Sequence, residues 1–255
     1  LNHPTKRNAL STEMLASLGR EVDAVTSDQN TKVIIIRSSH SAVFSSGHDL
    51  GELVPGAKES SITSNLSDKD IYEKHVNLFN LCSKVMLKVH NAPQPVIAEI
   101  SGIATAAGCQ LVASCDLAIA SKDSQFATPG VNIGLFCSTP AVPIARTLAP
   151  KHAMEMLLTG DMIPAKRAAE IGLINRVVDK EQLSSDVMAL AEKIAIKSRS
   201  AIRIGKDAYH KQVIMDIEAA YEYAGMTMVD NMCTSDAKEG ITAFLQKREP
   251  TWKDV

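Results

Sequence analysis

The chain has 255 residues, of which 45% are hydrophobic and 22% charged, and its formal net charge is -2. This length is enough to bury a sizeable core in one large domain, or in a domain with an appendage. A net charge near zero gives no global field for nucleic acid or an anionic membrane, so we expect neither as a partner. No apolar run reaches the roughly 20 residues of a membrane-spanning helix, and we expect a soluble protein.

The cysteines are odd in number, widely spread and without a CxxC pair. This usage is typical of free thiols in a reducing compartment, and it predicts neither a disulfide framework nor a zinc site. The spacing of Asp, Glu and His suggests no metal site either. The first ten residues, "LNHPTKRNAL", resemble neither a signal nor a transit peptide. The five cysteines are Cys82, Cys109, Cys115, Cys137 and Cys233.

Strand and helix signals alternate through the first two thirds of the chain. Helices are indicated by apolar residues at helical spacing, and buried strands by continuous β-branched runs. The alternation predicts an α/β fold of repeated strand–helix units. In chain order we expect a helix over 11–25 with Ser11 as its N-cap, a strand at 32–38, a short helix at Leu50, a mobile surface loop at 55–69, a helix over 71–89, and strands at 95–100 and 117–121.

The strand signal ends at about Asp179, and consecutive helical segments follow. A helical region after an α/β core is typical of an assembly module, and a simple lid over the core is the alternative. We therefore divide the chain into a core at 1–190 and a helical assembly region at 191–255.

A run of small residues, "GIATAAGCQLVASCD" at 102–116, joins the strands at 95–100 and 117–121. It predicts a tight turn and a short helix that begins near Ala107. Small side chains let a ligand approach the backbone, and the N–H groups of a first helical turn carry a partial positive charge. Tight packing of a helix on a sheet is the simpler alternative.

A second small-residue turn, "VFSSGHDL" at 43–50, follows the strand at 32–38. Two such turns after neighbouring strands can face each other and offer two N–H donors to a carbonyl oxygen that gains negative charge. The alternative for His48 and Asp49 is a capping pair at the helix near Leu50.

Taken in order, the motifs resemble the enoyl-CoA hydratase/isomerase (crotonase) superfamily over nearly the whole chain. The resemblance implies a spiral of repeated ββα units with a C-terminal helical trimerisation region, assembled as a trimer or a dimer of trimers. It also implies an acyl-CoA thioester as substrate or ligand in fatty acid metabolism, with no other cofactor, and a mitochondrial location. The motifs are "LNHPTKRNALS", "VIIIRS", "FSSGHDL", "PVIAEISGIATAAGCQLVASCDLAIAS", "FATPGVNIGL", "LLTGDMIPAKRAAEIGLINRVV" and "EGITAFLQKREPTW".

The same resemblance implies roles for individual residues. The two backbone amides that would hold the thioester oxygen map to His48 and Ala107. Phe244 and Lys247 match a tail motif that reaches the CoA of a neighbouring subunit. The segments that would line the CoA and thioester site are Lys6, Arg7, Asn8 and Ala9, then Ser45, Ser46, Gly47, Asp49 and Leu50, and Gly108; of these, Lys6 and Arg7 also supply the basic cluster that phosphates need.

The sequence departs from the family at both catalytic carboxylates. Gln110 occupies the place of the first glutamate and Gly130 the place of the second. An amide does not exchange a proton near neutral pH, and each general acid or base contributes about 10²–10⁴-fold, so little hydration should remain. Cys137 stands near the aspartate of a related branch and is a candidate acid, base or thiolate; a small buried hydrophobe is the alternative. Ser138 and Thr139 are expected to cap the next helix.

Three functions stay open at this point. The first is an acyl-CoA enzyme with non-standard acid and base groups. The second is a weak or inactive acyl-CoA-binding regulator of lipid metabolism, which the missing glutamates favour. The third is a trimeric scaffold, which the preserved small-residue turns disfavour because a scaffold has no need of them.

Overall fold

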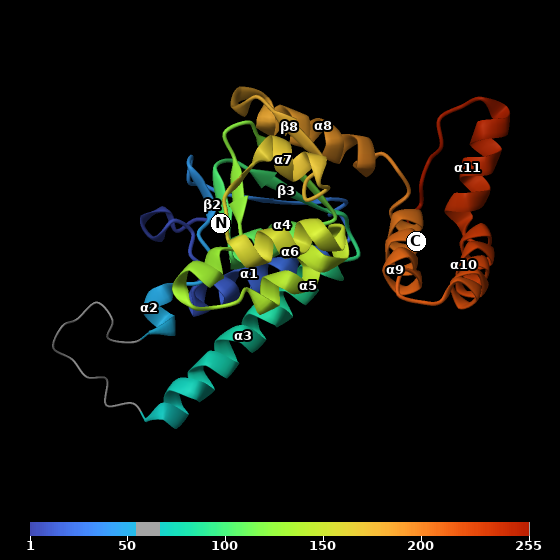
Figure 1. Cartoon of the computed structure of the whole chain (residues 1–255). Helices are drawn as coiled ribbons and strands as arrows, with labels where there is room; N and C mark the ends of the chain where they lie inside the picture. The colour runs from blue at the N-terminus through green and yellow to red at the C-terminus, as the bar shows by residue number, and fades with distance from the viewer. Residues whose placement is uncertain (55–66, 255) are drawn as a thin grey trace.

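The computed structural model describes residues 1–54 and 67–254 (Figure 1). Its core contains two four-stranded sheets. In the first sheet all neighbouring strands are parallel, as continuous β-branched runs predict. The order of this sheet is β1 (Ile34–Arg37), β3 (Val96–Ile100), β5 (Leu117–Ser121) and β8 (Arg176–Val178).

The second sheet is made of strands of two or three residues. Its first three strands are parallel, and the fourth is antiparallel to the third. The chain passes from one sheet to the other and then into a helix, three times in succession, which is the repeated ββα arrangement of the crotonase fold. The order of this sheet is β2 (Val43–Ser45), β4 (Ile103–Thr105), β6 (Gln125–Ala127) and β7 (Ile163–Pro164).

Helices cover the sheets and form the C-terminal region. The long helix α3 packs along α1, and α4 and α5 pack against each other. The helices are η1 (Pro4–Lys6), α1 (Thr12–Ser27), α2 (Leu50–Leu53), α3 (Asp68–His90), α4 (Ala107–Ser114), η2 (Pro129–Ile133), α5 (Ser138–Thr147), α6 (Pro150–Thr159), α7 (Ala165–Glu170), η3 (Lys180–Gln182), α8 (Leu183–Ala195), α9 (Arg199–Gln212), α10 (Ile217–Met232) and α11 (Ser235–Gln246).

The expected elements are confirmed where their signals are strong. The Ser11 hydroxyl accepts a hydrogen bond from the Met14 N–H at 3.2 Å and caps α1. Helix α3 begins earlier than predicted because Ser67 and Asp70 form a capping box. Of the expected surface loop at 55–69, residues 55–66 lie outside the described part of the chain. The residue pattern alone did not predict the strands of the second sheet, because two or three residues are too few for a periodicity to appear; only the resemblance implied a second strand in each unit.

The main core lies between the sheets and helices α1, α3, α4 and α5. Its largest fully buried side chains include Leu15, Phe44, Ile100, Phe126 and Ile144. The turn from β3 to β4 brings Gly102, at φ +79°, so close to Ala42 that a Cβ would lie 2.0 Å from the Ala42 carbonyl oxygen. Glycine is therefore the residue that lets the chain cross from one sheet to the other there.

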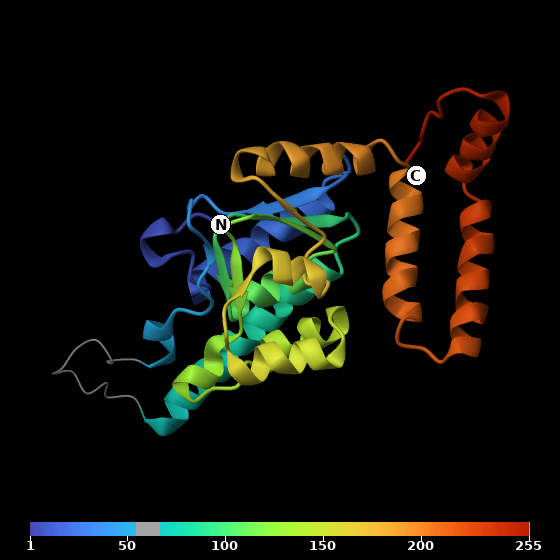
Figure 2. The same ribbon diagram turned by 45° about the horizontal axis from the view of Figure 1, so that its top comes forward.

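Helix α8 belongs to the core, so the boundary expected at residue 190 falls inside a packed helix. Leu183, Val187 and Ala191 of α8 are buried against Ile97 and Ile119 of the first sheet. The separation lies after Ala195, where the chain leaves the sheet and enters α9. Figures 1 and 2 both show α9, α10 and α11 standing beside the core rather than on it.

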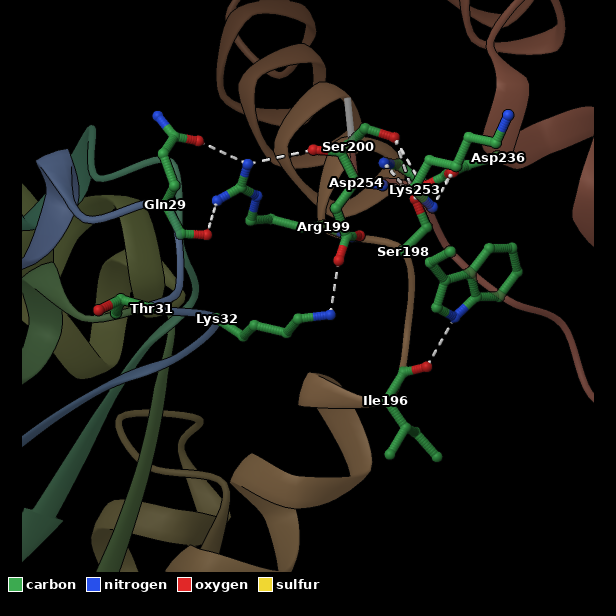
Figure 3. Close-up of polar contacts among 12 residues, drawn as sticks. Gln29, Thr31, Lys32, Ile196, Ser198, Arg199, Ser200, Asp236, Lys253 and Asp254 are labelled. Carbon is green, nitrogen blue, oxygen red and sulfur yellow. Dashed lines mark hydrogen bonds and ion pairs between the residues drawn. The ribbon is translucent and has the colours of Figure 1, made fainter.

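A buried carboxylate holds the C-terminal helices to the end of the chain, and the end of the chain holds them to the core (Figure 3). Asp236 of α11 is 2% exposed and accepts hydrogen bonds from the Ser198 hydroxyl at 2.6 Å and the Lys253 N–H at 2.8 Å. The next residue, Asp254, forms an ion pair with Lys32 at 2.7 Å. The last residues of the chain thus hold both α9 and the region before β1.

Among the helices that the structure describes, none combines the length and the hydropathy that crossing a bilayer requires.

Candidate acyl-thioester site

The two small-residue turns face each other, as the sequence predicts. They follow β2 and β4, which are parallel neighbours in the second sheet. A Cβ on Gly108 would lie 2.5 Å from the Ser45 carbonyl oxygen, and one on Gly47 would lie 2.8 Å from the Ala106 Cβ. Neither distance is possible for a real Cβ, so the contact between the two turns depends on glycine in both.

The contact places the start of helix α4 beside the turn that carries His48. Helix α4 begins at Ala107, directly after Ala106, whose φ of 49° and ψ of -118° are unusual for a residue with a side chain. Such strain costs about 1–3 kcal/mol and is typical of functional sites. Within the described residues, the N–H groups of Ala107 and His48 have no acceptor. Both amides are therefore able to donate to a group from outside the chain.

The N-terminal segment and the 45–50 turn, which were both expected to line the site, lie side by side. The Ser46 N–H donates to the Arg7 carbonyl at 3.2 Å, and the Leu10 N–H donates to the Gly47 carbonyl at 2.7 Å. The ammonium of the exposed Lys6 forms an ion pair with Asp49 at 2.7 Å. These contacts place the basic residues at the edge of the turn that carries the His48 amide.

Asn8 and Ala9 were also expected to lie along the nucleotide end of the ligand. Both are buried, and the Asn8 side chain accepts from the His3 N–H at 2.7 Å and donates to the Phe44 carbonyl at 3.2 Å. Their side chains stabilise the turn and are not presented to a ligand.

Asp49 caps the short helix α2, so the capping alternative is confirmed for this residue. Its carboxylate accepts a hydrogen bond from the Gly51 N–H at 2.9 Å. Leu50, the first residue of α2, is exposed. The His48 side chain turns the other way and takes no part in the cap.

The imidazole of His48 is held between two elements. Its Nδ1 lies 3.1 Å from the Leu10 carbonyl oxygen, and its ring meets the Phe79 ring of α3 edge-on, with the centroids 5.3 Å apart. Burial lowers the pKa of His48, more than the hydrogen bond to Leu10 and the nearby Glu52 raise it. The ring is therefore neutral at pH 7, and its Nε2 is buried with no hydrogen-bond partner among residues 1–54 and 67–254.

Gln110 lies on α4, one turn beyond Ala107, and is 3% exposed. Its side-chain oxygen lies 4.0 Å from the Cys82 sulfur of α3, which is in position to donate a weak hydrogen bond. Burial raises the pKa of Cys82 to about 12, so the thiol keeps its proton. The place where the resemblance implies the first glutamate is thus an enclosed, uncharged position.

Gly130, in η2, has no room for a side chain. A Cβ there would lie 2.7 Å from the Leu135 carbonyl oxygen and 2.9 Å from the Cys137 sulfur. The loop after η2 folds back over this position and is closed by a hydrogen bond from the Leu135 N–H to the Gly130 carbonyl, at 2.9 Å. The place of the second glutamate is therefore filled by the chain itself.

Cys137 follows that loop and is buried, as a small hydrophobe would be. Burial raises the pKa of its thiol, more than the hydrogen bond from Gly130 lowers it, which speaks against a thiolate at neutral pH. The expectation that Ser138 and Thr139 cap α5 is wrong. Cys137 occupies the N-cap position without a side-chain hydrogen bond, and the Ser138 hydroxyl donates to the Phe136 carbonyl at 3.4 Å.

Phe244 and Lys247 are not near the two turns of their own chain. They lie at the end of α11, and both views place that helix on the far side of the molecule from α2. Phe244 is 82% exposed.

Sequence reasoning missed three residues that shape the site, namely Leu10, Phe79 and Cys82. The helical periodicity of 71–89 places Cys82 on the buried face, but a periodicity does not say which side chain lies opposite. In the described ranges 1–54 and 67–254, no cluster of three His, Cys, Asp or Glu residues could hold a metal ion.

The sequence profile of the family described as enoyl-CoA hydratase/isomerase matches residues 1–255. The chain belongs to this family. A mouse relative named enoyl-CoA hydratase domain-containing protein 3, mitochondrial, is 48% identical over 99% of the chain and 79% of its own length. A bacterial family member from Syntrophomonas wolfei, named crotonyl-CoA hydratase, is 32% identical over 98% of the chain and 91% of its own length.

Solved structures of family members have the same fold. The crystal structure of human enoyl-CoA hydratase domain-containing protein 3 superposes with a TM-score of 0.90 at 48% identity, covering 99% of this chain and 94% of that one. An enoyl-CoA hydratase from Mycobacterium smegmatis gives a TM-score of 0.89 at 44% identity, covering 99% and 93%. The crotonase fold expected from the sequence is confirmed.

Proposed function

We propose that this protein binds an acyl-CoA thioester and holds the thioester oxygen between the N–H groups of His48 and Ala107. The observation that carries this function is the contact between the two turns, which needs Gly47 and Gly108 and leaves both amides without an acceptor in the described chain. Two fixed amide donors stabilise an oxygen most strongly when negative charge develops on it, as it does on a thioester carbonyl during enolisation or addition. Lys6 and Arg7 at the edge of the turn suit the phosphates of CoA.

We further propose that water addition to an enoyl-CoA is close to background. Hydration needs a group that activates water and a group that delivers a proton. Gln110 is an amide, Gly130 has no side chain, and the pKa of the Cys137 thiol is raised. The protein therefore acts as an acyl-CoA-binding member of the family, in fatty acid metabolism, that polarises a carbonyl without ordinary hydratase chemistry.

Ligand-induced stabilisation tests the binding. Butyryl-CoA should raise the melting temperature, because a ligand that binds only the native state adds about 2.7 kcal/mol at 100 times its Kd. Gly108→Ala, which separates the two turns, should weaken this shift. Gly205→Ala in α9, where a Cβ meets nothing within 4 Å, is the matched control. The absence of a shift with wild-type protein at saturating butyryl-CoA would overturn the proposal.

The hydration proposal is tested with crotonyl-CoA. We expect a turnover indistinguishable from the uncatalysed rate, measured as loss of the enoyl thioester absorbance. Robust turnover that is also insensitive to substitution of Cys137 would contradict this assignment.

Assembly as a trimer, or as a dimer of trimers, is a second proposal and rests on the C-terminal helices. Four strongly exposed apolar side chains there suit an interface between copies of the chain, with Phe244 and Lys247 reaching a neighbour's CoA: Ile217, Tyr221, Phe244 and Leu245. The mitochondrial names of the mouse, rat and human relatives support a mitochondrial location for this chain. We propose no resident cofactor beyond the CoA thioester itself.

A further inference from the structure

One buried polar atom at the site has no hydrogen-bond partner in the described part of the chain. The Nε2 of His48 is enclosed, and no described group donates to it or accepts from it. Buried polar atoms are nearly always paired, so an unpaired one needs an explanation. The atom lies within the proposed site, because the backbone N–H of the same residue is one of the two amides proposed for the thioester oxygen.

The tautomer of His48 follows from its other nitrogen. Nδ1 lies 3.1 Å from the Leu10 carbonyl oxygen, which accepts hydrogen bonds and cannot donate them. Nδ1 must therefore carry the proton, and in the neutral ring Nε2 carries a lone pair. The same carbonyl would stabilise the imidazolium if Nε2 took up a proton, because the Nδ1–H donor becomes more positive.

The surroundings of the ring keep this lone pair available. Burial lowers the pKa of His48, and Glu52 on α2 is the charged group that acts in the opposite direction. The Glu52 carboxylate is itself engaged, since it accepts hydrogen bonds from the Thr12 N–H at 2.9 Å and hydroxyl at 2.8 Å. The ring from α3 that meets the imidazole, Phe79, is uncharged.

Helix α3 links this imidazole to the place of the missing glutamate. Phe79 and Cys82 are three residues apart and share one face of α3. Phe79 contacts the His48 ring, and the Cys82 sulfur lies 4.0 Å from the Gln110 side-chain oxygen. His48 and Gln110 therefore lie under the same helical face, His48 on its turn and Gln110 on the helix that begins at Ala107.

We propose that the His48 side chain is the base of this site and removes a proton from the α-carbon of a bound acyl thioester. This role rests on the proposed function. The α C–H bond breaks, its proton goes to Nε2, and its electron pair forms a C=C bond while the carbonyl pair moves to the oxygen between the two amides. The imidazolium then returns a proton to the α-carbon, or exchanges it with solvent first. For an acyl chain to reach Nε2, the Phe79 ring has to move from its edge-on contact with the imidazole.

Hydrogen–deuterium exchange at the α-carbon measures this step without requiring net turnover. Butyryl-CoA is incubated with the protein in D₂O, and its mass is followed. Wild-type protein should incorporate deuterium faster than the buffer alone. His48→Ala keeps the backbone N–H and should lose about 10²–10⁴-fold of the rate, the usual contribution of a general base. Added imidazole should restore part of the exchange in this variant.

Two further variants separate a base from other roles. His48→Gln keeps a hydrogen-bond acceptor but cannot take up a proton, so its exchange rate should match that of His48→Ala. His152→Gln, on the surface of α6, should exchange as the wild type does. The base role is overturned if wild-type protein binds butyryl-CoA without exchanging it, if His48→Gln exchanges at the wild-type rate, or if imidazole restores nothing.

Thermal shift with butyryl-CoA is measured on every variant alongside the exchange. A retained shift with lost exchange in His48→Ala and His48→Gln supports the base. A shift that is absent even in the wild type is a failure of the proposed function itself, and the base role falls with it.

Discussion

At the scale of single residues, Gly130 is a firmer obstacle than Gln110 to the hydratase chemistry that we propose is absent. A glutamine can be changed to glutamate within the same space, whereas position 130 is closed by the Leu135 carbonyl. We expect Gly130→Ala to lower the free energy of unfolding by about 1–3 kcal/mol, the usual cost of forcing atoms into a packed site. Chemical denaturation measures this, with Gly205→Ala as the control that should cost far less.

The same contact limits how far hydration can be restored. Gln110→Glu with Gly130→Glu restores both carboxylates in the sequence. The side chain at position 130, however, has to displace the Leu135 backbone. We expect the double variant to be less stable than Gln110→Glu alone and to gain no more crotonyl-CoA hydration than that single change gives. A fully stable double variant with higher turnover would show that the loop after η2 opens easily.

At the scale of elements, α9 is attached to the core through a nearly buried ion pair. Lys206 of α9 lies 2.6 Å from Asp116, at the start of β5, and the two side chains are 11% and 20% exposed. The Asp116 carboxylate also accepts from the Val96 N–H at 2.7 Å. Lys206→Met removes a charge-assisted hydrogen bond, while Asp116 keeps the Val96 N–H and has the His210 Nε2 at 3.6 Å. We expect a loss of about 1.5–3 kcal/mol in denaturant melts. The matched variant Lys211→Met removes a lysine whose ion pair is exposed and should cost under 1 kcal/mol.

The same junction should respond to pH. His90, at the end of α3, packs against His210 with the ring centroids 4.0 Å apart and the ring planes tilted by 52°. Burial, and then His210 and Lys206, lower the pKa of His90 below its ordinary value of 6.5, although Asp116 acts in the opposite direction. Below pH 6.5 the unfolded chain therefore binds a proton that folded His90 resists, and the protein loses stability as the pH falls. His90→Gln should reduce the fall in melting temperature between pH 7 and 5. A smaller fall should persist, because the pKa of His48 is also lowered. If the melting temperatures of the wild type and His90→Gln fell equally steeply with pH, this prediction would be contradicted.

The elements also show what a sequence can and cannot predict here. Long signals, such as the β-branched run of β1 and the periodicity of α3, predict their elements because many residues agree. The facing of the two turns was expected from their positions after neighbouring strands. The three-residue strands β2, β4 and β6, the closed position at Gly130 and the contact between His48 and Phe79 depend on residues far apart in the chain, and no local pattern contains them.

At the scale of the whole molecule, the arrangement of the C-terminal helices suits an assembly. Asp236 and Asp254 fix α9 and α11 beside the core, so that the exposed side chains of α10 are held in one orientation. Preorganised apolar surface of this kind binds well because little freedom is lost on association. The assembly that we propose is thus prepared by the fold of each chain.

A single charge on α10 tests this assembly. Tyr221 is 75% exposed in the isolated chain, so Tyr221→Asp should leave the fold of that chain intact, with unchanged circular dichroism. In a trimer the same change would bury an unpaired carboxylate, which costs several kcal/mol at each interface. We therefore expect light scattering to find a trimer or hexamer for the wild type and a lower mass for Tyr221→Asp. Lys166→Asp, an exposed substitution on α7, should keep the wild-type mass. A wild-type protein that is monomeric at micromolar concentration would overturn the assembly, and with it the expectation that Phe244 and Lys247 reach the CoA of a neighbouring subunit.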